Sequence, residues 1–278
     1  MSSPTPAPAI VAALQMCSGE ERAANLATAG RLLESAAAEG ARVAVLPENF
    51  SMMARRDADR RALAETDGSG PVQEVLARRA RELQLWIVAG SVPIANDLSD
   101  RISQSCLVYD QQGERAARYD KIHLFDVDIP ERQESYRESA HMAPGDAIVT
   151  LDTPAGRLGV SICYDLRFPE LYRRLLDAGA QWLVVPAAFT AVTGAAHWEA
   201  LLRARAIENL CFVVASGQWG EHANGRRTHG HSMIIDYWGR ILALQASGDG
   251  AICAPLYLAA QAEARRNFPA LSHRVLHN

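Results

Sequence analysis

The sequence predicts an α/β protein in which mixed sheets are flanked by helices. Strand and helix patterns alternate from the first element to the last, and two strand pairs are joined by short turns of hairpin composition. Of the 278 residues, 49% are hydrophobic and 22% are charged. The alternation predicts parallel strands with crossover helices, the turns add antiparallel pairs, and the composition supplies an extensive core.

The first part of the chain reads as strand, helix, strand, helix, strand. Continuous apolar runs predict covered strands, and apolar residues at spacings of three and four predict amphipathic helices. Gly40 ends the first helix and Pro47 stops the second strand. The predicted strands are 9–16, 43–46 and 85–89, and the predicted helices are 21–38 and 71–84.

The later elements add hairpins to this alternation. Asp110-Gln111-Gln112-Gly113 and Pro154-Ala155-Gly156 have the composition of tight turns between strands. Between them, residues 121–144 show no clean period and predict a long functional loop. The strands beside the turns are 102–109, 114–119, 147–153 and 157–162; after them come helices 168–178, 195–209 and 258–267 and strands 182–185, 212–215, 232–236, 241–244 and 251–255.

No linker, repeat or low-complexity tract interrupts the pattern, so we expect one domain over residues 1–278. Residues 1–8 are rich in Pro, Ser and Ala and predict a flexible N-terminus, whereas 268–278 predict a C-terminal tail. The first residues lack the basic-then-apolar order of a signal peptide, and no apolar run reaches membrane-spanning length. We therefore expect no membrane partner.

The net charge and the number and spacing of the cysteines exclude several classes of protein. The formal net charge is -4, and the arginine pairs at 55–56 and 60–61 are too short for a nucleic-acid surface and read as a solvated loop. The five cysteines are odd in number and form no CxxC pair, which argues against a disulfide framework or a zinc knuckle. These features predict a cytoplasmic protein, in a reducing compartment, with no nucleic-acid partner.

Cys163 stands at the corner between a covered strand and a helix. Residues 159–162 are small or β-branched, while Pro169 and Glu170 suit the first turn of a helix. Backbone N–H groups at such a turn favour a thiolate and can hold a developing oxyanion. The sequence context leaves two interpretations open, a nucleophile or a buried structural cysteine.

Three reactive side chains follow predicted strands at equivalent places. Glu48, Lys121 and Cys163 each come directly after a strand, and ligands of open α/β sheets bind beyond the carboxyl ends of strands. A carboxylate can take the thiol proton and return it to a leaving amine, while an ammonium and the Tyr164 N–H stabilise the tetrahedral oxyanion. Taken singly, Glu48 also fits a loop cap and Lys121 a solvated side chain.

Five segments of the sequence resemble the nitrilase superfamily of carbon–nitrogen hydrolases. They occur in the same order as in that family, and the resemblance covers nearly the whole chain. The resemblance implies a four-layer αββα sandwich, no cofactor, and a Glu–Lys–Cys triad at Glu48, Lys121 and Cys163, with Glu138 as a further carboxylate that positions the lysine and the substrate. It also implies an even-numbered homo-oligomer, a dimer or a tetramer. The segments are 46–50 (LPENF), 119–126 (YDKIHLFD), 162–170 (ICYDLRFPE), 194–199 (GAAHWE) and 203–209 (RARAIEN).

Within the superfamily, the chain is most similar to the deaminated glutathione amidase branch. The resemblance implies an amidase that cleaves deaminated glutathione to 2-oxoglutarate and cysteinylglycine. The neighbouring omega-amidase branch cleaves 2-oxoglutaramate and releases ammonia, so the two share the acyl product and differ in the leaving amine. The stretches that carry this similarity are 201–208 (LLRARAIE), 228–233 (THGHSM) and 265–270 (RRNFPA), with His273 and Arg274.

Further candidates surround the predicted nucleophile. Arg167 suits a bidentate clamp on a substrate carboxylate or an ion pair with Glu170. The polar loop 217–230 suits either a contact with a larger leaving group or plain solvation, which we favour. The histidines are not at metal-ligand spacing, so we expect no metal. Three residues after a strand end are expected to line the pocket: Phe189, Thr190 and Thr193.

Two alternative functions remain open at this stage. A non-catalytic, partner-binding member of the fold would be marked by loss of a triad residue, and all three are present. A true nitrilase or another small-molecule amidase of the superfamily would share the triad, and an assay of one nitrile against one amide separates the nitrilase. A small-molecule amide is therefore the expected partner.

Overall fold

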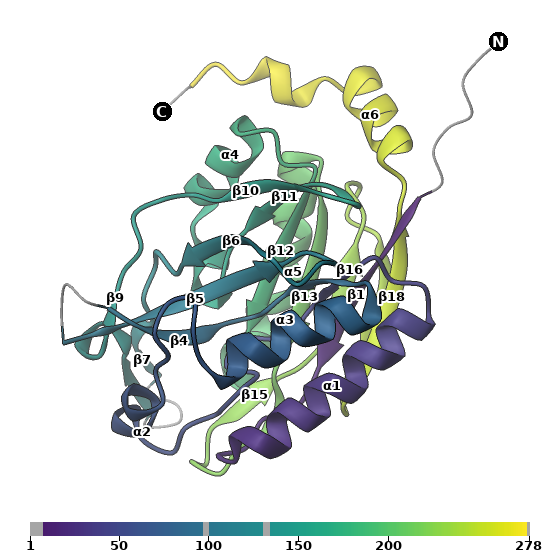
Figure 1. Cartoon of the computed structure of the whole chain (residues 1–278). Helices are drawn as coiled ribbons and strands as arrows, with labels where there is room; N and C mark the ends of the chain where they lie inside the picture. Colours follow the sequence, from purple (N-terminus) through teal and green to yellow (C-terminus); the bar gives the residue numbers. More distant parts are fainter. Residues whose placement is uncertain (1–7, 97–99, 130–133, 277–278) are drawn as a thin grey trace.

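The computed structural model describes residues 8–96, 100–129 and 134–276, whose strands form two large sheets stacked face to face (Figure 1). In this part of the chain the first sheet has eight strands, and β6 and β9 both pair with β5 beside the main path. Its main path runs β18 (Gly250–Leu256), β1 (Ala9–Gln15), β2 (Val43–Val45), β3 (Trp86–Val88), β5 (Ile102–Tyr109), β4 (Val92–Ala95), with β6 (Arg115–Asp120) and β9 (Met142–Ala143) at the side.

The second sheet mixes parallel and antiparallel neighbours, as the alternation of helices and hairpins predicts. Its strands run β10 (Thr150–Thr153), β11 (Gly156–Val160), β12 (Trp182–Ala187), β13 (Phe212–Gly217), β16 (Ser232–Ile235), β17 (Ile241–Gln245). Two separate hairpins pair β7 (Asp126–Ile129) with β8 (Glu134–Arg137) and β14 (Trp219–Glu221) with β15 (Arg227–His229).

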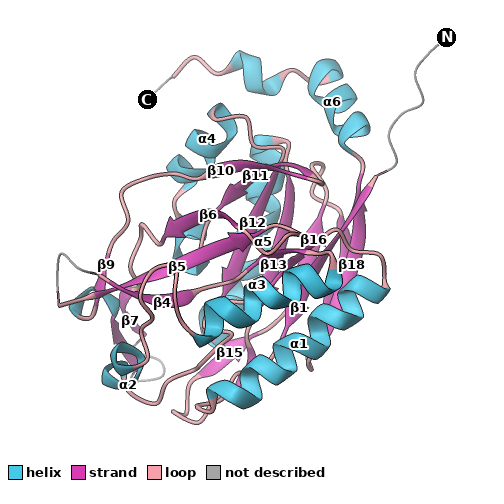
Figure 2. Cartoon of the chain, viewed as in Figure 1, coloured by secondary structure: helices cyan, strands magenta, loops and turns pink. Residues whose placement is uncertain are grey.

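Helices cover the outer faces of both sheets (Figure 2). The helices are α1 (Arg22–Ala38), α2 (Asp57–Ala62), α3 (Pro71–Leu83), α4 (Pro169–Asp177), α5 (Ala191–Asn209) and α6 (Leu258–Asn267), with 3-10 turns η2 (Glu138–Ala140), η3 (Cys163–Arg167) and η4 (Ala270–His273). Helices α1 and α3 pack on the first sheet, and α4 and α5 on the second. This order confirms the expected αββα sandwich.

Strand β1 explains the continuous apolar runs of the sequence. Val11 and Ala13 point into the core between the two sheets, whereas Ala12 and Leu14 point to the core under α1 and α3. Because both faces of such a strand are covered, neither set of alternating positions is polar. The loops that follow β2, β11 and β12, together with the end of β6, surround one pocket.

The structure changes three sequence-based expectations. The predicted loop 121–144 contains β7, β8, η2 and β9, because its polar residues pair across a hairpin; residues 130–133 lie outside the described part. The arginine-rich stretch at 60–61 belongs to α2, not to a loop. The predicted tail 268–278 folds into η4, and Arg274 Nη1 lies 2.6 Å from Asp177 Oδ1.

Residues 1–7 and 277–278 lie outside the described residues. None of the described helices is long and apolar enough to span a membrane.

Candidate active site

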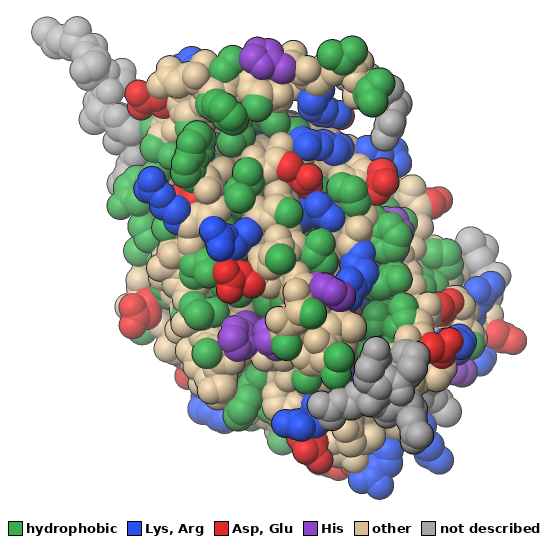
Figure 3. Space-filling model, turned by 180° about the vertical axis from the view of Figure 1, so that it is seen from behind, with side chains coloured by type: hydrophobic (Ala, Val, Ile, Leu, Met, Phe, Trp, Pro, Cys, Tyr) green, Lys and Arg blue, Asp and Glu red, His purple; other side chains and the backbone are tan. Residues whose placement is uncertain are grey.

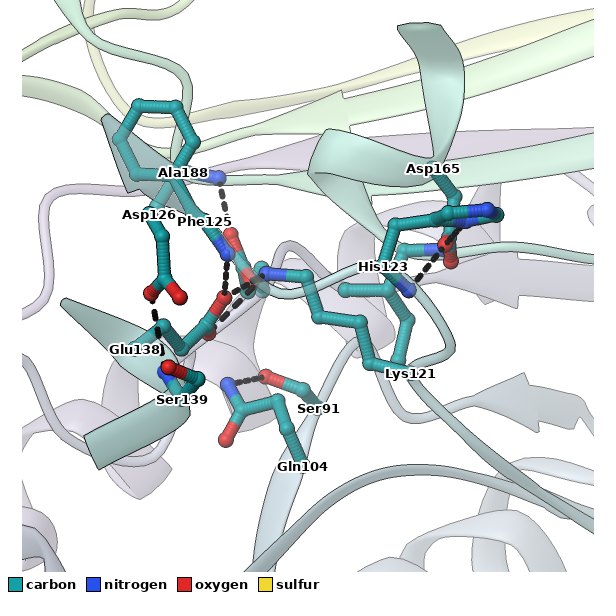
Figure 4. A network of polar contacts seen from close by, with 12 residues as sticks. Ser91, Gln104, Lys121, His123, Phe125, Asp126, Glu138, Ser139, Asp165 and Ala188 are labelled. Carbon is teal, nitrogen blue, oxygen red and sulfur yellow. Dashed lines mark hydrogen bonds and ion pairs between the residues drawn. The ribbon is translucent and has the colours of Figure 1, made fainter. Parts of the chain in front are cut away.

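Lys121 lies buried between two carboxylates, with 2% of its side chain exposed. Its Nζ donates to Glu48 Oε1 at 2.9 Å and to Glu138 Oε1 and Oε2 at 3.0 and 2.9 Å, as Figure 4 shows for Lys121 and Glu138. The backbone N–H of Phe125 donates to Glu138 Oε2 at 2.6 Å and holds that carboxylate in place. The structure therefore brings together two residues of the predicted triad and the predicted positioning carboxylate.

Glu48 is oriented by the loop that follows β2. The Ala188 N–H donates to Glu48 Oε2 at 2.8 Å, which leaves Oε1 for Lys121. The next residue, Asn49, has φ +58° and donates its N–H to Ser91 Oγ. Beside it, a Cβ on Gly90 would come 2.0 Å from the carbonyl oxygen of Pro47, so only glycine fits there. This close packing fixes where the Glu48 carboxylate points.

Cys163 occupies a sharp turn where β11 passes into η3. Its φ of +48° is rare for a residue with a side chain and costs free energy that the surrounding packing must offset. Cys163 as a whole residue is 6% exposed and lines the same pocket as Glu48 and Lys121. The three side chains predicted to meet therefore share one pocket, with Cys163 at its wall.

A buried carboxylate, Asp165, supports this turn from behind. Its Oδ2 accepts the Ile162 N–H at 2.9 Å, and its Oδ1 accepts the His123 N–H at 3.1 Å. The His123 ring nitrogen Nδ1 lies 2.7 Å from Oδ1, and the ring stacks on Phe168 at 3.7 Å between centroids. Sequence reasoning did not single out Asp165, although an acidic residue two positions after the cysteine was visible.

The charges in the site determine its protonation. Burial by itself raises the pKa of the Glu48 carboxyl, but the charge and hydrogen bond of Lys121 hold that pKa below its ordinary value. Burial likewise disfavours the charged form of Lys121, yet the charges of Glu138 and Glu48 raise its pKa. Burial, followed by the Glu48 charge, raises the pKa of the Cys163 thiol well above its ordinary value. The resting site thus holds a carboxylate, an ammonium and a neutral thiol.

Two opposing effects act on the Cys163 thiol. The backbone N–H groups at its turn favour a thiolate, but the thiol is buried next to the negative Glu48, and both of these features favour the protonated form. A neutral thiol needs a base before it can attack a carbonyl carbon. Glu48 is the carboxylate beside the thiol that can accept its proton, and a hydrogen bond between the two groups contributes to both pKa shifts.

The pocket has about 740 Å³ of free space, including its open mouth. The three predicted lining residues Phe189, Thr190 and Thr193 all lie on its wall, and the two threonine hydroxyls are 2.7 Å apart. Tyr164, predicted to donate its N–H to the oxyanion, also lies on the wall. In the described part of the chain, no three His, Cys, Asp or Glu side chains are grouped so that they could hold a metal ion.

Arg167 is the predicted substrate-binding residue that the structure does not bring into the pocket. It is absent from the described residues that line the wall. Its guanidinium lies over the Phe189 ring at 5.0 Å and over the Tyr164 ring at 5.8 Å, with Nη1 3.3 Å from His197 Nδ1. The guanidinium thus packs against two residues of the pocket wall, and no ion pair between Arg167 and Glu170 is formed within the described residues.

Two arginines on the pocket wall were missed. Arg226 comes from the loop 217–230, for which solvation was the favoured interpretation, and Arg60 comes from the stretch interpreted as a solvated loop. His222 of the same loop is also buried, at 4% exposure. A run of polar residues does not reveal which side chain faces inward, so the sequence carried no signal for either arginine.

Comparisons with known proteins show what the chain is similar to. The sequence profile described as "Carbon-nitrogen hydrolase" matches residues 10–266. A deaminated glutathione amidase of Yersinia enterocolitica is 44% identical over 264 residues, which cover 95% of this chain and 92% of that protein. The crystal structure of Saccharomyces cerevisiae Nit3, a member of branch 10 of the nitrilase superfamily, is 29% identical with a TM-score of 0.87 and covers 99% of both chains.

A third relative bears on the cysteine. It is a variant of the amidase from Nesterenkonia sp. AN1, 25% identical with a TM-score of 0.77, and the match covers 94% of this chain and 99% of that one. In that structure acrylamide has added to the active site cysteine by Michael addition. These similarities span nearly the whole of each protein.

Proposed function

Since the chain belongs to the carbon–nitrogen hydrolase family and is a hydrolase of non-peptide carbon–nitrogen bonds, we propose that it is an amidase that cleaves deaminated glutathione through Glu48, Lys121 and Cys163. The observation that carries the proposal is the contact of Lys121 with both Glu48 and Glu138 in the pocket lined by Cys163. The products are 2-oxoglutarate and cysteinylglycine.

The first step forms the bond between sulfur and the amide carbon. Glu48 takes the Cys163 proton as the sulfur attacks, and the carbonyl electron pair moves onto oxygen. Because the pKa of Glu48 is lowered and that of Cys163 is raised, full proton transfer in the resting site is unfavourable. The transfer therefore accompanies formation of the carbon–sulfur bond.

The negative oxygen is stabilised by Lys121 and by the Tyr164 N–H. The Lys121 ammonium has three N–H groups, and its contacts go to one oxygen of Glu48 and two of Glu138. One bond to Glu138 suffices to hold that pair, so one N–H can turn to the oxyanion. Glu138 is thus a positioning residue for Lys121 in this proposal.

The remaining steps restore the enzyme. Glu48 gives its proton to the amine nitrogen as the carbon–nitrogen bond breaks, which leaves a thioester on Cys163. Water then attacks the thioester carbon, Glu48 takes the water proton, the carbon–sulfur bond breaks, and the proton returns to sulfur. The acid leaves, and no other co-reactant is consumed.

Three further features belong to the proposal. We propose that residues 1–278 form one hydrolase domain that acts in the cytoplasm without a cofactor and as an even-numbered homo-oligomer. Exposed apolar side chains support the last point: Ile207, Trp238 and Phe268 are 49, 49 and 52% exposed. On the face drawn in Figure 3, apolar side chains are interspersed with acidic and basic ones. Sedimentation velocity of the full chain tests the oligomer, and a monomer contradicts it.

The proposal is tested by kcat/KM on deaminated glutathione beside 2-oxoglutaramate. We expect the first to be the better substrate, and comparable or reversed rates point to omega-amidase activity. The Cys163→Ala protein should show no turnover and no thioester by mass spectrometry. Cys253→Ala, which alters a partly exposed cysteine of β18, is the matched control. Undiminished turnover of Cys163→Ala contradicts the mechanism.

A further inference from the structure

Two arginines line the pocket with polar atoms that lack a partner. The Nε atoms of Arg60 and Arg226 are buried, and neither has a hydrogen-bond partner within the described residues. A buried donor left without an acceptor destabilises the folded protein, so such atoms call for an explanation. Two of them on one pocket wall, from α2 and from the β14–β15 hairpin, indicate that a ligand supplies the acceptors.

Arg226 is held rigidly close to the reacting groups. Its Nη2 donates to the Ala188 carbonyl oxygen at 2.5 Å, and its guanidinium lies 5.1 Å from the Tyr136 ring centroid. The N–H of the same Ala188 holds Glu48. The Arg226 charge is one of the effects that lower the pKa of Glu48, and it opposes part of the rise in the pKa of the Cys163 thiol. The Arg226 guanidinium is thus fixed on the pocket wall through the same residue that orients the Glu48 carboxylate.

The hairpin that carries Arg226 is tied to the segment that leads into α2. Asn224 Nδ2 donates to the Ala54 carbonyl oxygen at 3.0 Å. This contact joins the two chain segments that supply Arg226 and Arg60, which are far apart in sequence. Both arginines therefore reach the pocket from neighbouring elements of its wall.

The other cations of the pocket are already neutralised. Lys121 contacts Glu48 and Glu138, and Arg137 Nη2 lies 2.9 Å from both carboxylate oxygens of Asp128. Among the described residues, neither Arg60 nor Arg226 has a carboxylate within 4.0 Å. The pocket thus offers two positive charges to a ligand, in planar groups that match a carboxylate.

We propose that Arg226 and Arg60 form an anion subsite that binds the carboxylate at the far end of the substrate's acyl chain. The inference rests on the proposed function and deepens it, because the subsite selects amides of dicarboxylic acids over neutral amides. We assign the subsite to the acyl part because Ala188 links Arg226 to Glu48, and the acyl part is the one that becomes attached to Cys163 beside Glu48. In this proposal the two arginines do not contact the leaving amine.

Binding of 2-oxoglutarate to the full-length Cys163→Ala protein, measured by calorimetry, tests the subsite. We expect Arg226→Met and Arg60→Met to raise Kd by roughly 10- to 100-fold each, since each removes hydrogen bonds to a charged group. Arg226→Lys should give a smaller rise, because the charge remains and the planar fork is lost. Arg227→Met and Arg61→Met, at the exposed neighbouring positions, are matched controls and should leave Kd unchanged.

Hydrolysis by the protein with Cys163 intact distinguishes failure of the subsite from failure of the proposed function. The arginine variants should lose kcat/KM on 2-oxoglutaramate by a factor at least tenfold larger than on pentanamide, a neutral amide with the same five-carbon acyl chain. Equal losses on both amides, or an unchanged Kd for 2-oxoglutarate in both variants, overturn the subsite. If the wild type cleaves neither deaminated glutathione nor 2-oxoglutaramate yet binds 2-oxoglutarate through Arg226, the proposed function fails and the subsite stands.

Discussion

The Tyr119 hydroxyl donates a hydrogen bond of 2.7 Å to Asp165 Oδ2, and both side chains are buried. Tyr119 lies in β6, two residues before Lys121, and Asp165 lies two residues after Cys163. The same carboxylate oxygen accepts the Ile162 N–H. One buried group therefore sets the position of the lysine strand relative to the turn that carries the thiol.

Replacing Asp165 with asparagine should loosen both segments at once. The variant removes the charge and turns one acceptor into a donor facing other donors, which costs about 1.5–3 kcal/mol of unfolding free energy. We expect kcat to fall by roughly 10- to 100-fold with KM little changed, because misplaced reacting groups slow chemistry more than binding. Urea unfolding and steady-state kinetics measure the two effects. Tyr119→Phe, which removes one of the bonds, should show a smaller loss of each, and a wild-type kcat in Asp165→Asn contradicts the assignment.

Replacing Glu138 with glutamine should leave Lys121 with one carboxylate partner. Because the charge of Glu138 is the foremost of the effects that raise the Lys121 pKa, that pKa should fall and the ammonium should be held less firmly. We expect kcat to drop by roughly 10- to 100-fold, compared with about 100- to 10,000-fold for loss of the base in Glu48→Gln.

The matched control for this variant is Glu134→Gln, in β8, the strand that directly precedes Glu138. Glu134 accepts a hydrogen bond from the Tyr136 hydroxyl at 2.8 Å and is not among the described residues on the pocket wall. The Glu134→Gln change should leave kcat within about twofold of the wild type, as most changes of surface contacts do. Equal effects of the two variants speak against a positioning role for Glu138.

The pH dependence of kcat/KM should be flat across neutral pH. Glu48 acts as its carboxylate, so activity is present above its folded pKa and is lost as pH falls through that value, which lies below the ordinary glutamate range. The raised pKa of the Cys163 thiol moves the alkaline limb above the ordinary cysteine range. A plateau from about pH 5 to about pH 8.5 follows from the ordinary values of the two groups. A limb centred between about pH 6 and pH 8 is incompatible with this protonation.

His229 should make stability depend on pH. Its partial burial, followed by the charge of the stacked His231, lowers its pKa from 6.5 to about 4. Between these values the unfolded chain binds the proton and the folded ring does not, so stability is fully present above pH 6.5 and is lost as pH falls toward about 4.

The loss amounts to on the order of 1 kcal/mol, because the half-exposed ring is partly screened by solvent. We expect His229→Gln to flatten the fall in urea-unfolding free energy over this range. His273→Gln, which changes an exposed histidine of η4, should leave the wild-type slope. An identical slope in the His229 variant contradicts the prediction.

Most of the regular structure could be predicted from the sequence, and the reason is local. Strand 9–16 and helix 21–38 appear as β1 and α1 with ends shifted by one residue, because burial on one or both faces imposes a period on the residue types. Helix α2 and strand β4 were not predicted. Both are short and lie among polar residues and turns, where no period can be read.

The sequence by itself determined that mixed sheets are flanked by helices and that Glu48, Lys121 and Cys163 follow strand ends, because strand and helix periods are properties of neighbouring residues. The four αββα layers came from the family resemblance, which the tertiary structure bears out. The tertiary structure decided what those residues touch. The bond of Lys121 to two carboxylates, the neutral state of the Cys163 thiol and the inward turn of Arg226 depend on segments far apart in the chain. Such contacts follow from burial and long-range pairing, which leave no repeating signal in the residues around them.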